Sequence, residues 1–98
     1  DQAHVVLELE HPAKLSKFVL RNYASNKYCI QYKPLFDDVD GSWKDLKPWT
    51  TCDWYKDITL PLDINDEQES VLTQQIKFLV DDGSESSWKL INVYGFPV

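Results

Sequence analysis

The stretch that decides the fold is His4-Val5-Val6-Leu7-Glu8-Leu9-Glu10, in which apolar and charged side chains alternate. One face of this segment carries Val5, Leu7 and Leu9, and the other carries Val6, Glu8 and Glu10. A period of two predicts a half-buried β-strand, because successive side chains of a strand point to opposite faces. His11-Pro12-Ala13 follows directly. We expect the strand to end there, since proline cannot donate a hydrogen bond to a strand ladder.

The same alternation recurs along the chain and predicts further strands over residues 15–21, 28–33, 54–60, 71–80 and 87–94. Residues 43–46 form a short strand candidate, and residues 47–53 are expected as loop or short extended chain. Asp82-Gly83 after an apolar strand is a hairpin signal. No segment predicts a convincing amphipathic helix. The pattern therefore indicates an all-β fold, an antiparallel β-sandwich of about six to eight strands.

The length, 98 residues, suits one domain over residues 1–98. The aromatic fraction of 13% excludes a disordered chain. A domain of this size holds a small core but not a deep enclosed active site as well. Because the sequence begins at Asp1 without methionine, we expect an excised or processed piece of a larger protein.

The charge balance argues against two classes of partner. The chain has 16 acids and 10 bases, a net charge of −6, and its bases form no stripe. Binding to nucleic acid and to anionic membranes both depend on clustered positive charge. We therefore expect neither partner.

The two cysteines, Cys29 and Cys52, do not form a C-x-x-C unit, so a zinc site is not expected. Two buried free thiols are favoured over a disulfide between them, which stays open as the alternative. No Asn is followed two residues later by Ser or Thr. This lack of glycosylation sites favours an intracellular location.

No catalytic motif is recognisable, and we expect the chain not to be an enzyme. His4 and His11 lie at opposite ends of one predicted strand, about 20 Å apart at roughly 3.3 Å per residue. They cannot share a proton relay or a metal ion within that strand. The serine-hydrolase, metalloprotease and phosphate-loop motifs are all absent from the sequence.

The loop Asp37-Asp38-Val39-Asp40-Gly41 resembles half of a calcium loop. Placing Gly41 at position 6 of an EF-hand puts Phe36 at position 1 and Lys47 at position 12, and neither can bind the ion. We reject an EF-hand. Asp37, Asp38 and Asp40 remain weak candidates for an irregular calcium site, and otherwise no cofactor or metal is expected. The alternative is an Asp-rich turn.

The four tryptophans are candidates for a sugar-stacking or protein-binding surface. Trp54 and Trp88 lie in alternating segments, so we expect both in the core. Trp43 follows a turn and is expected to cover one end of the sandwich. Trp49 lies beside Pro48 and is the best candidate for an exposed aromatic. The acidic residues 63–69 offer either a docking surface for a basic partner or a solvated loop.

Three segments together resemble the discoidin-like, or galactose-binding-like, β-sandwich of coagulation factor V/VIII type C domains. They are AHVVLELEHPAKLSKFVLRNY (residues 3–23), YCIQYKPLFDDVDGSWKDL (residues 28–46) and QQIKFLVDDGSESSWKLINVYGF (residues 74–96). The resemblance implies a jelly-roll sandwich. The terminal cysteines of secreted members are absent, so intracellular adaptor members, such as the Doc-type subunit of the anaphase-promoting complex, resemble the chain better. These members use the sandwich to dock proteins.

We therefore expect a non-enzymatic protein-interaction module that acts as an adaptor or scaffold domain of a larger assembly. Its contacts would come from loops at one end of the sandwich, through Phe36, Asp38, Asp40, Trp43 and Trp49. The alternative is a carbohydrate-binding module that stacks sugars on Trp43 or Trp49, with calcium held by the aspartates.

Overall fold

The computed structural model describes residues 3–22, 26–35, 42–62, 72–81 and 88–97. These residues form six strands: β1 (Ala3–Asn22), β2 (Lys27–Pro34), β3 (Lys44–Thr51), β4 (Asp57–Pro61), β5 (Leu72–Val80) and β6 (Trp88–Pro97). Every strand pairing is antiparallel. The prediction of an all-β, antiparallel sandwich is therefore confirmed. The described ranges include no helix long and apolar enough to cross a membrane.

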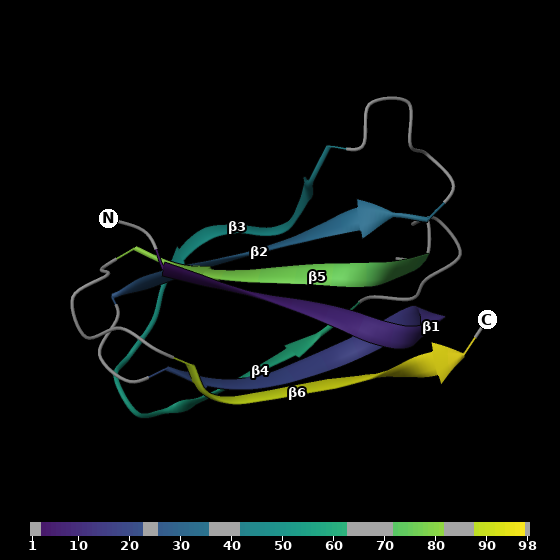
Figure 1. Cartoon of the computed structure of the whole chain (residues 1–98). Coiled ribbons are helices and arrows are strands. Elements are labelled where there is room, and N and C mark those ends of the chain that lie inside the picture. Colours follow the sequence, from purple (N-terminus) through teal and green to yellow (C-terminus); the bar gives the residue numbers. More distant parts are fainter. Residues whose placement is uncertain (1–2, 23–25, 36–41, 63–71, 82–87, 98) are drawn as a thin grey trace.

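The long strand β1 belongs to both layers of the sandwich (Figure 1). Its first part pairs with β5, which continues the order β3-β2-β5-β1. Its second part lies between β4 on one side and β6 on the other. The first layer is thus β3-β2-β5 with the start of β1, and the second layer is β4 and β6 with the end of β1.

The expected strand end at Pro12 is wrong, because β1 continues through it. Between the pairs Glu8↔Gln75 and Ala13↔Thr73 the register shifts, so that five steps along β1 match two along β5. Proline is tolerated at such an irregularity, since the looped-out residues donate nothing to the neighbouring ladder. This bend carries β1 from one layer into the other.

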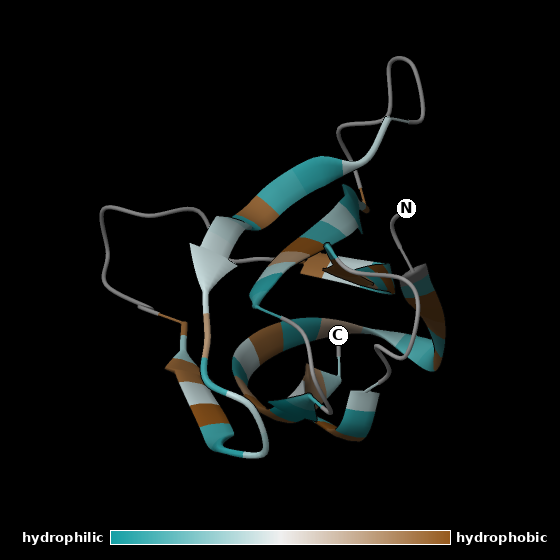
Figure 2. Cartoon of the chain, turned by 90° about the vertical axis from the view of Figure 1, so that its left-hand side faces the viewer, coloured by the Kyte–Doolittle hydropathy of each residue, from teal (hydrophilic) through white to brown (hydrophobic). Residues whose placement is uncertain are grey.

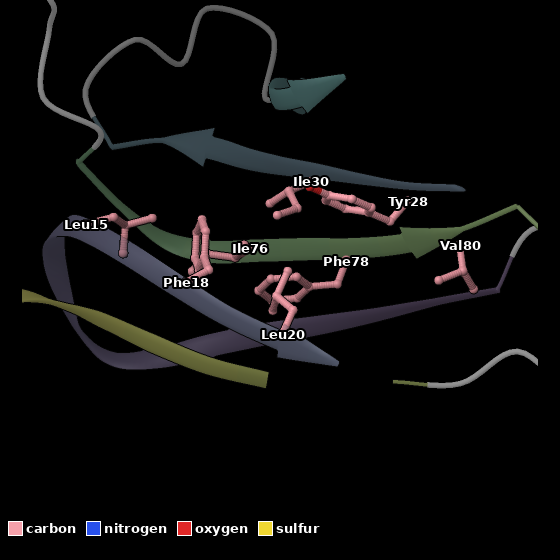
Figure 3. Packing of buried hydrophobic residues seen from close by; sticks show 8 residues of the cluster. All are labelled: Leu15, Phe18, Leu20, Tyr28, Ile30, Ile76, Phe78 and Val80. Atoms are coloured by element: carbon pink, nitrogen blue, oxygen red, sulfur yellow. The ribbon is translucent and has the colours of Figure 1, made fainter. Parts of the chain in front are cut away.

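The core lies between the two layers and is built from the predicted apolar faces. Its fully enclosed side chains come from β1, β2 and β5, and Figure 3 shows them pointing toward one another: Leu15, Phe18, Leu20, Tyr28, Ile30, Ile76, Phe78 and Val80. Phe18 and Phe78 meet edge to face at 5.6 Å between ring centroids, and Trp88 continues this contact at 6.1 Å from Phe78. Edge-to-face pairs add stability beyond the burial of area.

Alternation along the strands is visible as alternating brown and teal bands in Figure 2. In β2 and β5 most of the predicted apolar faces are buried, but Cys29 and Leu79 on the opposite faces are buried as well, and Tyr32 is only partly buried. The bounds of β3 and β4 also differ from the prediction. Residues 47–51 continue strand β3, and β4 begins only at Asp57, so that Trp54 and Tyr55 form a turn instead of a strand.

Two buried polar side chains tie the strands together. The Thr73 hydroxyl donates to the carbonyl oxygen of Lys33 at 2.6 Å and accepts from the Gln75 N–H at 3.1 Å. The Asn22 side-chain amide donates to the Asp53 carbonyl oxygen and to the Cys52 sulfur, both at 3.1 Å. Satisfied groups of this kind hold β5 to β2 and the β3–β4 connection to β1.

Candidate functional site

Most of the predicted contact loop lies outside the described residues. Phe36, Asp37, Asp38 and Asp40 belong to this part, as do the acidic residues 63–69. The predicted calcium candidates and the loop contact therefore stay predictions. Within the described residues, no group of three or more His, Cys, Asp or Glu is placed to hold a metal ion.

Trp43 is half-buried, and two lysine ammonium groups lie over its ring. The Lys77 ammonium is 4.4 Å from the ring centroid, and the Lys33 ammonium is 5.1 Å from it. Lys33 comes from β2 and Lys77 from β5, and the pairing Gln31↔Lys77 places both strands side by side. Ammonium groups at such distances are attracted to the π-face of the indole. They also occupy ring surface that a sugar would need for stacking.

Trp49 is 40% exposed and lies in the outer strand β3, where the prediction had loop or short extended chain. Between the pairs Tyr28↔Thr50 and Tyr32↔Lys44, six steps along β3 match only four along β2, so Trp49 and Trp43 lie roughly 13 Å apart along the sheet at 3.3 Å per residue. No ring contact joins the two tryptophans in the described part of the chain. Trp49 offers an isolated aromatic contact.

The expectation that Trp54 lies in the core is wrong. Its side chain is 54% exposed, because the chain turns at Trp54 instead of entering β4, and its Nε1 donates to the Asn26 side-chain oxygen at 2.9 Å. Trp88 packs against the core as expected. Its buried Nε1 has no hydrogen-bond partner among the described residues.

The cysteines are free thiols, as favoured from the sequence, and both are hard to ionise. Burial, with a second contribution from the Asp45 carboxylate, raises the pKa of the Cys29 thiol to about 11. Burial and the carboxylates of Asp81 and Asp53 also raise the pKa of Cys52, against a lowering by the Asn22 amide. The thiolate is the nucleophile, so neither sulfur is activated.

His4 and His11 lie on the same strand, β1: His4 pairs with Leu79 of β5, and His11 lies in the bend between Glu8 and Ala13. His11 is exposed, and its Nε2 is 3.8 Å from the carboxylate of Glu10. No hydrogen bond is described between His11 and a hydroxyl or thiol. Among the residues that the structure describes, neither histidine is hydrogen-bonded to a nucleophile that it could activate.

An apolar groove lies where the bend of β1 meets the end of β6. We call it the β6 groove. It has a volume of about 230 Å³ and is open to solvent. Its lining is mostly apolar and comprises Leu9, His11, Pro12, Ala13, Leu15, Val93, Gly95, Phe96 and Pro97.

Gly95 allows β6 to approach β1 closely at this groove. A Cβ atom added there would lie 2.4 Å from the carbonyl oxygen of Lys14, a backbone atom that cannot swing away. Any other residue would force the two strands apart. Glycine at this position therefore sets the width of the groove floor.

Two exposed aromatic side chains stand beside the groove. Phe96 is 60% exposed and Tyr94 is 43% exposed. They pair across the sheet with Lys14 and Lys17, and the Lys17 ammonium lies 4.6 Å from the centroid of the Tyr94 ring. We call these four residues the aromatic–lysine face. They lie on the outer side of the second layer, since Phe18, next to Lys17, points into the core.

This surface is not predicted from the sequence, because the last predicted strand ends at residue 94, before Phe96. The signal that would have found it is Val93-Tyr94-Gly95-Phe96-Pro97, in which Tyr94 and Phe96 alternate with Val93 and Gly95. Treating these residues as strand places both rings on one face. No protein-family model and no curated protein sequence matches the chain.

Proposed function

We propose that this chain is a non-enzymatic protein-interaction module of a larger assembly, and that it binds its partner at the β6 groove and the aromatic–lysine face. The observation that carries the proposal is the exposure of Phe96 and Tyr94 beside an open apolar groove of about 230 Å³. Aromatic side chains beside a pocket are typical anchors of protein interfaces. An apolar patch of this kind on a small domain marks a contact surface.

The rigidity of the surroundings supports this role. Tyr94 and Phe96 lie on strand β6, which pairs with β1 over residues 88–97. A rigid strand loses little conformational entropy when a partner binds, so more of the contact energy appears as affinity. The discoidin-like character suggested by the sequence would be compatible with such docking, and we propose it as the sandwich type.

The test is a comparison of proteins captured by immobilised variants. Proteins retained by the wild type and by the matched control Trp54→Ala, which removes an exposed aromatic elsewhere, should be lost with Tyr94→Ala/Phe96→Ala. Retention of the same set by the double variant would contradict the site. If Trp49→Ala alone lost them, the contact predicted at Trp49 would replace the β6 surface.

Carbohydrate binding is the second candidate, and the 40% exposure of Trp49 is the observation that favours it. Trp43 contributes less, because two lysines lie over its ring. Titration of tryptophan fluorescence with a glycan panel, with and without calcium, tests this role. A change that disappears in Trp49→Ala would support it, and a flat response across the panel would remove it.

A further inference from the structure

The backbone of β6 has an edge beside which no described strand lies. β6 pairs with β1 on one side, and among the described elements no strand pairs with its other side. Figure 1 shows β6 along the border of the sandwich, next to β1. N–H and C=O groups along such an edge can pair with an added strand. We call residues 90–97 the β6 edge.

Two other outer strands carry features that oppose the addition of a strand. β3 contains Pro48, which has no N–H, and two register shifts interrupt its pairing with β2. β4 has only five residues and ends on Pro61. Short length, proline, charge and bulges are the usual protection of sheet edges.

The β6 edge lacks this protection over most of its length. Residues 90–96 contain no proline and no charged side chain. The bulge near Leu15 belongs to β1, so β6 itself advances regularly from residue 90 to residue 97. Among these three outer strands, β6 is the best suited to accept an eight-residue partner strand.

Charge indicates the chemistry of that strand. On the outer side of the second layer the described charges include Lys14, Lys17, Arg21 and Asp57, and Arg21 is paired with Asp57 at 2.7 Å. Lys89 is a further exposed base of β6. Lys14 and Lys17 make no ion pair with a described residue. This face is therefore positive within a chain of net charge −6. The nearest described carboxylate along the groove, Glu10, faces His11.

We propose that the β6 edge binds an extended acidic segment of a partner protein as an added β-strand, with its glutamates toward Lys14 and Lys17 and its apolar side chains at the β6 groove. This inference rests on the proposed function and names the partner's chemistry. Side chains of a strand alternate between faces, so one alternating segment satisfies both surfaces. An added strand lies two strand spacings, about 10 Å, from β1. A glutamate and a lysine reaching toward each other span that separation.

A second copy of the chain fits this edge less well. Residues 88–97 contain no carboxylate to face the lysines of the other copy. Both copies would also carry a net charge of −6, which opposes their association. The same net charge also repels an acidic partner. At 0.15 M salt, however, the Debye length is about 8 Å, so the more distant acids are screened and the attraction to the adjacent lysines dominates.

The probe is the blocked peptide acetyl-(Glu-Val)4-amide, titrated into the protein at 0.15 M salt by isothermal calorimetry, with acetyl-(Lys-Val)4-amide as control. We expect only the glutamate peptide to bind. The double variant Lys14→Glu/Lys17→Glu should bind this peptide about tenfold more weakly, because the attraction of each lysine to a peptide glutamate becomes a repulsion of similar size. Lys33→Glu/Lys77→Glu, the same charge change at Trp43, should leave the affinity unaltered. Circular dichroism checks that both variants are folded.

The backbone contribution is tested separately by N-methylation of the peptide. Only alternate N–H groups of a strand point toward its neighbour. We therefore compare two peptides, one methylated at the four glutamate nitrogens and the other at the four valine nitrogens. One should not bind, because its methyl groups replace the N–H groups that face β6, and the other should bind like the unmethylated peptide. Equal effects of both methylations would overturn strand addition.

Three further outcomes overturn the proposal: no binding of the glutamate peptide, equal binding of the lysine peptide, or a dimer in sedimentation velocity that Lys14→Glu/Lys17→Glu leaves intact. None of them contradicts the proposed function. Capture of a partner that depends on Tyr94 and Phe96 would then still show a docking surface, one that recognises a different segment.

Discussion

Replacing Gly95 by alanine tests how tightly β6 is held against β1. The added Cβ would lie 2.4 Å from the Lys14 carbonyl oxygen, whereas real Cβ atoms stay beyond 3.0 Å, so the strands must separate by at least 0.6 Å. A backbone hydrogen bond of about 2.9 Å would be stretched to roughly 3.5 Å, where it is largely lost. Lost hydrogen bonds and strain cost about 1–3 kcal/mol. The lower entropy of the unfolded alanine chain offsets about 0.4–1 kcal/mol of this.

We therefore expect Gly95→Ala to lower the free energy of unfolding by about 1–2 kcal/mol and Tm by about 5–10 °C. Urea unfolding followed by tryptophan fluorescence measures the change. Asn92→Ala, an exposed position of the same strand, is the control and should stay within about 0.5 kcal/mol of the wild type. A Gly95→Ala protein as stable as the wild type would refute the close approach of β6 to β1.

Three further substitutions test the core and its polar contacts. Phe18→Ala removes a fully buried ring from its edge-to-face contact with Phe78 and should cost about 3–5 kcal/mol in the same urea assay; a loss below 1 kcal/mol would place Phe18 outside the core. Thr73→Val keeps the shape but leaves the Lys33 carbonyl without its donor, and calorimetric unfolding should show a loss of about 1–3 kcal/mol; an unchanged Tm would contradict the hydrogen bond. Cys29, with a thiol pKa of about 11, should react with iodoacetamide far more slowly at pH 8 than an unfolded cysteine, which mass spectrometry of the labelled peptide measures. Because this folded pKa lies above the unfolded value of about 8.5, the free energy of unfolding should fall as the pH rises from about 8.5 toward 11, and Cys29→Ala should flatten that fall; equal slopes for both proteins would contradict the burial of the thiol.

The strands of this protein were predictable wherever one face is buried. Phe18 and Leu20 in β1, and Ile76, Phe78 and Val80 in β5, alternate with less buried residues and are the core. Where both faces of a segment are partly exposed, as in β3 and β4, alternation carries less information. This is why residues 47–51 are predicted only as loop or short extended chain, and why the strand predicted from residue 54 begins at Asp57 instead.

The path of β1 could not be predicted from the local sequence pattern around Pro12. Pro12 is a strong local signal for the end of a strand. The strand nevertheless continues, because the same stretch leaves its pairing with β5 and enters the pairing with β6. Such a change of partner depends on the distant strands β5 and β6, and neither is visible in the residues around Pro12.

The β6 surface could not be predicted from the sequence for a related reason. Sequence reasoning weighed tryptophans in segments with turn residues, and it selected Trp43 and Trp49. The lysines over Trp43 come from β2 and β5, and Phe96 meets Lys14 only through the pairing of β6 with β1. The close approach at Gly95, which shapes the groove, is likewise a contact between strands far apart in sequence.

The most direct test of the β6 surface is amide hydrogen exchange, read residue by residue by NMR, with and without acetyl-(Glu-Val)4-amide. If this peptide adds as a strand, alternate amides within residues 90–97 should become protected, while the amides of β3 around Trp49 stay unchanged. Protection confined to β3, or no protection at residues 90–97 while the peptide is bound, would contradict docking at β6.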